Sequence, residues 1–110
     1  MAYDEALAVR MRKAFAGRGI DVIEKKMFGG LSFMVAGNMC CGVIKDEMMV
    51  RVGQSGHDDA MALPHTRIMA MGERPMEGWV LVGREGFASD ADMEAWVQRG
   101  LDYVATLPAK

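Results

Sequence analysis

The sequence predicts an α+β fold: an antiparallel β-sheet of about six strands, arranged as a meander plus a hairpin, with an N-terminal helix, a short middle helix and a C-terminal helix. Apolar residues recur at helical spacing at both ends of the chain, and short segments separated by glycine-containing turns fill the part between. The 110 residues contain no linker-like stretch, so we expect one domain over residues 1–110.

The N-terminal helix is predicted over residues 4–16. Leu7 and Met11 lie one helical turn apart, Asp4 is suited to the N-cap, and Gly17 marks the end. The charged side chains of this segment are expected to form its solvated face.

The first four strands are predicted to form a meander. Gly29-Gly30 and Gly37-Asn38 are two-residue links that tolerate a positive φ, and Asp46 suits a tight reversal. A phosphate-binding loop at the first glycine pair is disfavoured, since neither the dinucleotide-binding glycine pattern nor a Gly-Lys-Ser/Thr ending is present. The strands are expected at residues 22–28, 31–36, 39–45 and 47–52.

Alternation along these strands predicts which residues face the core. The core-facing sets are Leu31, Phe33, Val35, Met48, Val50 and Val52. The opposite face is a mixture too apolar for full exposure and too polar for a deep core, which indicates partial cover by another element or by a second subunit. That face carries Ser32, Met34, Ala36, Met49 and Arg51.

Residues 54–65 are expected to form a turn and then a short helix, opened by Asp58 and Asp59 and ended by Pro64. Two strands, at 67–71 and 78–83, follow. The segment between them contains Gly and Pro, which favours a loop over residues 72–77.

The C-terminal helix has the clearest pattern, because Ser89 followed by Asp92 forms a capping-box pattern. Its buried face is predicted to consist of Met93, Trp96, Val97, Leu101 and Val104.

Composition places the chain among ordinary globular proteins, with 51% hydrophobic and 25% charged residues. No apolar run approaches the roughly 20 residues that cross a bilayer, and the charged N-terminal segment is unlike a signal peptide, so we expect a cytoplasmic protein without membrane contact. The formal net charge of −2 disfavours direct nucleic-acid binding.

Two groups of residues suggest an alternative function as a small enzyme or ligand-binding protein. Cys40 and Cys41 are adjacent, so in a regular strand they point to opposite faces; we expect reduced, mostly buried thiols, with the outward-facing member left open. His57 and His65 are eight residues apart, which does not match the spacing of a metal-binding helix. We therefore expect no catalytic residues, no metal and no cofactor.

Twelve methionines are an unusual number for this length. Methionine fills irregular cores or forms adaptable binding surfaces, and we expect most of them in the core. Met34, Met49 and Met76 are the candidates for an interaction surface, because their strand parity or loop position leaves them outside the predicted core.

Several blocks of the sequence together resemble the N-terminal domain of the TfoX/Sxy family of bacterial competence regulators. The most specific is Met27-Phe28-Gly29-Gly30 before a hairpin. Further similar blocks are 34–42, 49–53, 72–80 and the closing helix through 107–108.

This resemblance implies an α+β domain that acts as a non-enzymatic regulatory or protein-interaction module, with no established catalytic residues. In the better-known members a helical C-terminal domain follows, and the protein is a positive regulator of genes for DNA uptake. We expect a stand-alone domain here, with a protein partner and a homodimer as the interactions to test. The motif residues Met27, Phe28, Gly29 and Gly30 join the methionines named above as the candidate surface.

Overall fold

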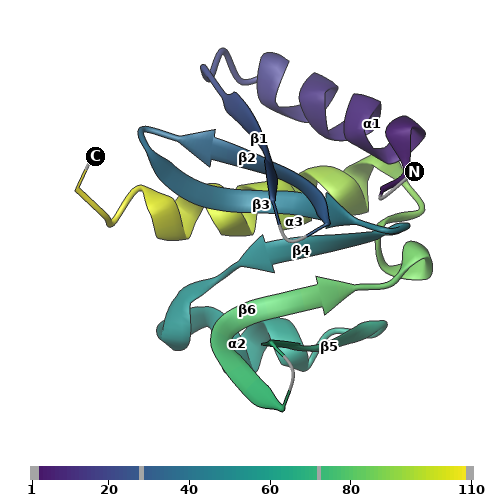
Figure 1. The fold of residues 1–110 in the computed structure, drawn as a ribbon, viewed down its shortest axis with the longest axis vertical. Helices are drawn as coiled ribbons and strands as arrows, with labels where there is room; N and C mark the ends of the chain where they lie inside the picture. Colours follow the sequence, from purple (N-terminus) through teal and green to yellow (C-terminus); the bar gives the residue numbers. More distant parts are fainter. Residues whose placement is uncertain (1–2, 28, 72, 109–110) are drawn as a thin grey trace.

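The computed structural model describes residues 3–27, 29–71 and 73–108. Within these residues three α-helices and one six-stranded antiparallel sheet form the fold (Figure 1), which confirms the predicted α+β class. The helices are α1 (Glu5–Ala16), α2 (Gly53–Met61) and α3 (Asp90–Val104), and a short 3-10 helix, η1 (Arg84–Phe87), precedes α3. The strands are β1 (Ile23–Met27), β2 (Gly30–Val35), β3 (Asn38–Ile44), β4 (Glu47–Arg51), β5 (Thr66–Met71) and β6 (Arg74–Val82).

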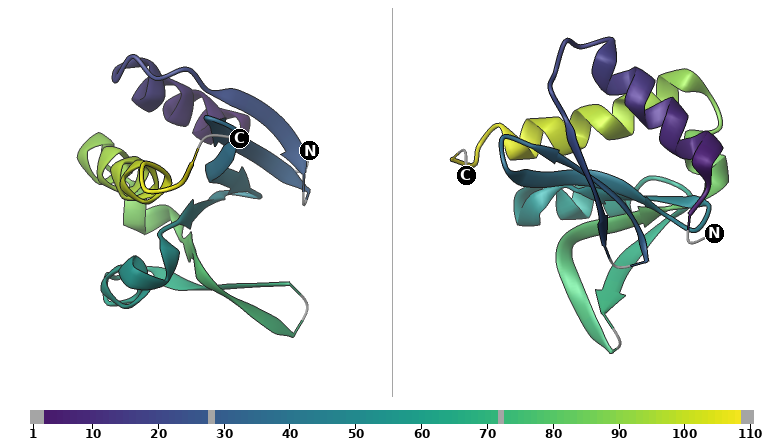
Figure 2. Two further views of the ribbon diagram at one scale, coloured as in Figure 1. Left: turned by 90° about the vertical axis from the view of Figure 1, so that its left-hand side faces the viewer. Right: turned by 45° about the horizontal axis from the view of Figure 1, so that its top comes forward.

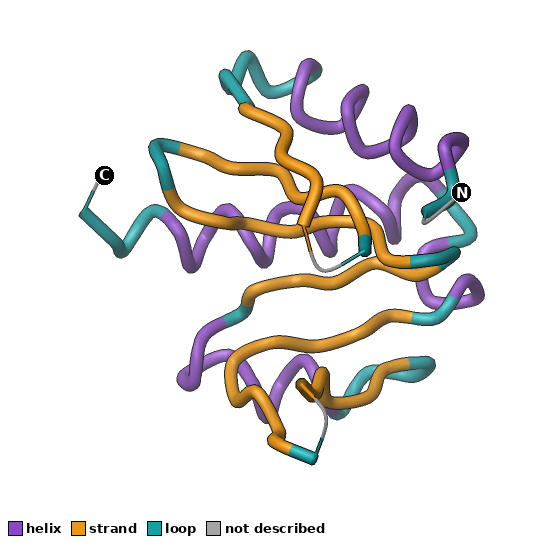
Figure 3. Tube along the Cα trace, in the orientation of Figure 1, coloured by secondary structure: helices purple, strands orange, loops and turns teal. Residues whose placement is uncertain are grey.

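The sheet has the order β1-β2-β3-β4-β6-β5 (Figure 3). β1 to β4 form the expected meander, each strand antiparallel to the next. The chain then passes through α2 to the edge strand β5 and returns as β6, which pairs with both β4 and β5. The last two strands are therefore the predicted hairpin, attached to the meander through its second strand.

The helices lie on one side of the strongly curved sheet and leave its other side free of helices (Figure 2). Phe15 of α1 stacks on Phe33 of β2, with 5.5 Å between the ring centroids. Between helices and sheet lies a core that includes Leu7, Met11, Phe15, Leu31, Phe33, Val43, Met48, Val50, Val80, Val82, Met93, Trp96, Val97, Leu101 and Val104.

Two of the predicted helix caps are confirmed. Asp4 accepts hydrogen bonds from the backbone of Ala6 and Leu7, and Ser89 Oγ accepts one from Asp92 N at 3.1 Å. These bonds satisfy amide groups that have no partner inside the helix.

The expected start of the middle helix is wrong. α2 begins at Gly53, directly after β4, and Asp58 and Asp59 are exposed in its second half. The N-cap, Val52, makes no side-chain hydrogen bond. Gly53 has φ of +74°, so the chain can reverse out of β4 without an intervening turn.

The predicted loop over residues 72–77 is also wrong in part, because β6 begins at Arg74. Pro75 pairs with Ala70 of the edge strand β5, near the beginning of β6, where the absence of an N–H group is tolerated. The register shifts between Ile68 and Ala70, and Gly78 has φ of +88°, so β6 bends at this point.

The turn between β2 and β3 consists of Ala36 and Gly37, both with positive φ, in place of the predicted Gly37-Asn38. Asn38 is the first residue of β3 and is buried. Its Nδ2 donates to the carbonyl oxygen of Pro108 at 2.9 Å, which ties the segment after α3 to this turn.

Candidate interaction surface

The family-like motif lies at the hairpin between β1 and β2. Gly29 has φ of +74°, as the predicted turn requires. Gly30 is not a turn residue as predicted: it is the first residue of β2 and pairs with Met27. It is needed for a different reason, because a β-carbon there would lie 2.1 Å from the carbonyl oxygen of Val43. The backbone of Met27 ends β1, and Phe28 lies outside the described residues. The glycines are therefore explained by backbone geometry.

The strand register identifies the residues on the helix-free side of the sheet. Ile23 pairs with Met34, and Met34 pairs with Met39. Further along, Gly42 pairs with Met49, and Met49 pairs with Leu81. Because paired residues share a face, these side chains lie opposite the core. We call the apolar surface formed by Ile23, Met34, Met39 and Leu81 the open face.

Exposure varies along the open face. Ile23 is 64% exposed, more than any other large hydrophobic residue whose side chain the structure describes, and Met34, Met39 and Leu81 are partly buried. Two charged residues, Lys25 on β1 and Arg67 on β5, are exposed at the two edges of the sheet. The result is an apolar strip between charged margins.

Met49 has no exposed surface, which does not suit its predicted place on an interaction surface, although it does not belong to the core between the helices and the sheet. It is fully buried although it points to the helix-free side. Gly42 has no side chain, and a β-carbon there would lie 2.5 Å from the Met49 methyl carbon. The Met49 methyl group therefore occupies the space that a side chain at position 42 would fill.

Met76 is a candidate for the interaction surface, and Ser32 belongs to the sheet face that was expected to be partly covered. Met76 lies in β6 and is partly buried, so it belongs to a strand and not to the predicted loop. Ser32, also on the helix-free side, is fully buried, and its hydroxyl has no hydrogen-bond partner within the described residues.

Both cysteine thiols are buried, so neither of them faces outward. Phe33 pairs with Cys41 and Met34 with Met39, which leaves Cys40 as an extra residue in β3. This β-bulge breaks the alternation on which the prediction of opposite faces depended. Burial, and next the neighbouring Cys40 side chain, raise the pKa of the Cys41 thiol, which keeps it protonated at neutral pH.

The histidines have separate surroundings. His57 Nδ1 accepts a hydrogen bond from Gly78 N at 3.3 Å, where β6 bends. His65 directly precedes β5, and its Nδ1 is 3.9 Å from a carboxylate oxygen of Glu85 in η1. Within the described residues no group of three or more His, Cys, Asp or Glu side chains is placed to hold a metal ion.

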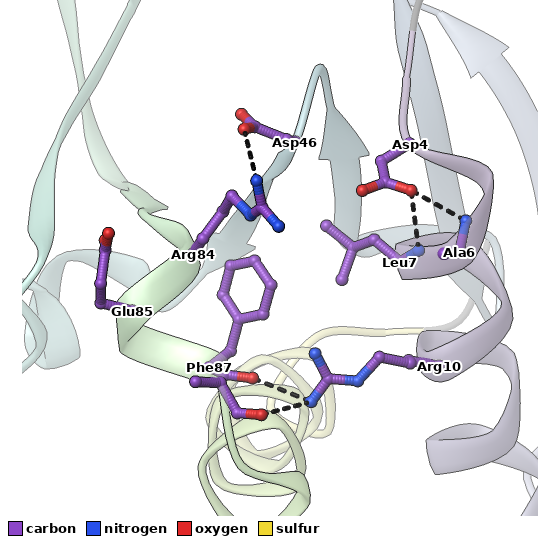
Figure 4. A pocket seen from close by; sticks show the side chains of 9 residues that line it. Asp4, Ala6, Leu7, Arg10, Asp46, Arg84, Glu85 and Phe87 are labelled. Atoms are coloured by element: carbon purple, nitrogen blue, oxygen red, sulfur yellow. Dashed lines mark hydrogen bonds and ion pairs between the residues drawn. The ribbon is translucent and has the colours of Figure 1, made fainter.

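A cavity of about 520 Å³ lies where α1, η1 and the β3–β4 turn meet (Figure 4). Its polar side chains already have partners. Arg10 Nη2 donates to Phe87 O at 2.9 Å, and Arg84 Nη1 is 3.9 Å from Asp46 Oδ2. Asp4 caps α1. We therefore interpret this cavity as a structural junction that fixes α1 against η1.

The fold is a small α+β domain whose sheet has one side without helices, on which Ile23 is exposed. The family model described as TfoX N-terminal domain matches residues 13–104, nearly the whole chain, so this chain belongs to the TfoX N-terminal domain family. The predicted resemblance is confirmed. No curated protein and no solved structure gives a significant match.

No helix among the described residues is long and apolar enough to span a membrane.

The sequence interpretation missed three of the four residues of the open face. Ile23 follows a predicted strand start, and Met39 and Leu81 have the parity of the helix-free side once the register is known. Cross-strand pairing was the missing information, because alternation within one strand does not reveal which residues gather across several strands.

Proposed function

We propose that this chain is a non-enzymatic regulatory module that binds another protein through the open face. The single observation that carries the proposal is the apolar strip around Ile23 on the side of the sheet without helices. Ile23 is exposed, and the neighbouring Met34 and Met39 are partly buried. An apolar patch between polar margins is typical of a protein-interaction site.

The composition of the open face suits a protein partner. Met34 and Met39 are paired across β2 and β3, so two flexible thioether side chains stand side by side. Methionine adapts its shape to an apposed surface and is polarizable. Lys25 is exposed at one edge, where it can pair with a carboxylate of the partner and so orient the complex.

Membership of the TfoX N-terminal domain family supports the regulatory part of the proposal. The resemblance to competence regulators implies a role in controlling gene expression through contacts with other molecules of the regulatory machinery.

The alternative of a small enzyme has less support from the geometry. The thiols of Cys40 and Cys41 are buried, and the pKa of Cys41 is raised, which opposes nucleophilic reactivity. His57 and His65 contact different parts of the chain, so the described residues offer them no shared site.

Affinity capture of the tagged protein from its own cells, combined with the transcript profile of a deletion strain, tests the proposal. We expect one or more proteins enriched over the untagged control and a changed set of transcripts. Background recovery together with an unchanged profile would contradict both parts of the proposal.

A second copy of the chain is the other candidate occupant of the open face. Light scattering over a range of protein concentrations separates the two cases. A concentration-dependent doubling of mass that Ile23→Glu abolishes would assign the open face to a homodimer. A monomer at high concentration would leave it to a different protein.

A further inference from the structure

Two cavities lie side by side between the start of α2 and the end of α3. The larger, about 500 Å³, is lined by Arg51, Gln54, Ser55, Glu77, Trp79 and Tyr103, together with backbone of Gly53 and Gly78. The smaller, about 280 Å³, includes Arg99 and Asp102 in its lining. Ser55 and Tyr103 line both, so the two cavities share a wall.

The arginines of these cavities differ from the other arginines of the chain. Five of the eight arginines pair with carboxylates. Within the described residues, no carboxylate lies within 4.0 Å of Arg51, Arg99 or Arg74. Two of these three line the paired cavities, whereas Arg74 is exposed at the start of β6.

Both cavity arginines are held in place by aromatic rings. The guanidinium carbon of Arg51 lies 5.5 Å from the ring centroid of Trp79 and 5.3 Å from that of Tyr103. Arg99 lies 5.5 Å from the ring centroid of Trp96. Stacking uses the face of the guanidinium and leaves the N–H groups on its edge available. One of these, Nη1 of Arg51, donates to Met39 O at 3.4 Å.

We propose that the paired cavities bind a small molecule that carries two or more phosphate groups. Partly buried guanidinium groups that are already oriented and lack a carboxylate partner are suited to a multivalent anion, and Ser55 Oγ adds a donor between them. This site is separate from the proposed protein interaction and does not depend on it.

Two carboxylates also line the cavities, and removing the negative charge of one of them should raise the affinity for phosphate. Glu77 Oε2 accepts from Gln54 Nε2 at 3.4 Å in the larger cavity, and Asp102 Oδ1 accepts from Gln98 Nε2 at 2.8 Å in the smaller. Because Glu77 repels a bound anion, Glu77→Gln is expected to strengthen phosphate binding. A gain in affinity cannot result from misfolding.

The experiment is calorimetric titration of the full chain with pyrophosphate at low ionic strength, with succinate as a second probe. We expect saturable pyrophosphate binding that is weakened about ten-fold or more by Arg51→Gln. Arg84→Gln is the matched control, since Arg84 is exposed and pairs with Asp46, and it should bind as the unmodified chain does.

If Arg51→Gln fails to fold, a second variant, Ser55→Asp, still tests whether the cavities bind phosphate. Ser55 is exposed in the first turn of α2, where an acidic residue favours the helix, so the variant should fold while repelling the anion. Loss of binding in Ser55→Asp and a gain in Glu77→Gln would support the site. Absence of pyrophosphate binding, binding of succinate alone, or unchanged affinity in both variants would overturn it.

Discussion

A β-carbon on Gly30 would lie 2.1 Å from the carbonyl oxygen of Val43, so β2 and β3 approach each other closely only because Gly30 has no side chain. The neighbouring Gly29 has open space around its α-carbon and a φ of +74°. Adjacent glycines of one motif thus have different physical roles.

This difference predicts unequal effects of substitution by alanine. Gly29→Ala costs about 1 kcal/mol, the strain of a left-handed alanine. Gly30→Ala requires displacement of backbone and should cost more, about 2 to 4 kcal/mol. Urea denaturation of both variants measures the two values. Equal stabilities of the two variants would contradict the prediction that a β-carbon at position 30 clashes with the carbonyl oxygen of Val43.

Substitution by alanine is expected to have different effects on stability at two serines, Ser32 and Ser89. Ser32→Ala removes a buried hydroxyl without a described partner and should leave stability unchanged or raise it by about 1 kcal/mol. Ser89→Ala removes the N-cap of α3 and should lower stability by about 1 kcal/mol. Thermal denaturation of the two variants under one buffer condition compares them. A loss of stability in Ser32→Ala would indicate that the Ser32 hydroxyl makes a hydrogen bond, contrary to the structure.

The ion pair between Arg12 and Glu24 predicts a pH dependence. The hydrogen bond from Arg12, with Nε to Oε2 at 2.7 Å, lowers the pKa of Glu24 below its ordinary 4.5. A lowered folded-state pKa stabilises the fold above the unfolded-state pKa, and this contribution disappears as pH falls through the folded-state pKa.

Glu24→Gln should therefore lower the free energy of unfolding near neutral pH by less than about 1 kcal/mol, since the pair is partly exposed. The difference from the unmodified chain should shrink and disappear as the pH falls through the lowered pKa of Glu24, because the carboxylate is then protonated and the ion pair is lost. Denaturant titrations over a series of pH values from neutral into acid measure it, and exposed Asp59→Asn serves as control. A difference that persists in acid would have another cause than this ion pair.

Burial of both thiols predicts that they are unreactive in the folded protein. Cys40 and Cys41 should react with a thiol reagent near neutral pH only as fast as the chain unfolds, and both should react at once in denaturant. A chromogenic disulfide reagent with absorbance detection follows both reactions. Rapid reaction of one thiol in the folded state would revive the hypothesis of a reactive cysteine.

Much of the fold follows from local patterns in the sequence. Alternation placed Phe33, Met48 and Val50 in the core, and all three are buried. Capping chemistry placed the starts of α1 and α3 within a residue. These features depend on neighbours in sequence, which a single chain displays directly.

Features that depend on several strands were not predictable. The bulge at Cys40 arises from the register between β2 and β3, and the burial of Met49 depends on Gly42 in the neighbouring strand. Arg51, Ser55 and Arg99 come from three different elements, so their proximity to the paired cavities appears only in the folded chain.

If a partner binds the open face, substitution of two exposed apolar residues by glutamate should affect partner binding differently. Ile23, 64% exposed, lies on the open face, whereas Val9, 43% exposed, lies on α1 on the other side of the sheet. Because both side chains are already exposed, Ile23→Glu and Val9→Glu should leave the fold intact, which circular dichroism checks. Each substitution replaces an exposed β-branched apolar residue by glutamate and adds one negative charge, so Val9→Glu controls for the added charge.

The measurement that tests the proposed function most directly is quantitative affinity capture from cells with the unmodified chain, Ile23→Glu and Val9→Glu in parallel. Proteins enriched by the unmodified chain should be lost with Ile23→Glu, by about ten-fold or more, and retained with Val9→Glu. Equal recovery with Ile23→Glu and the unmodified chain would contradict the assignment of the open face as the binding surface.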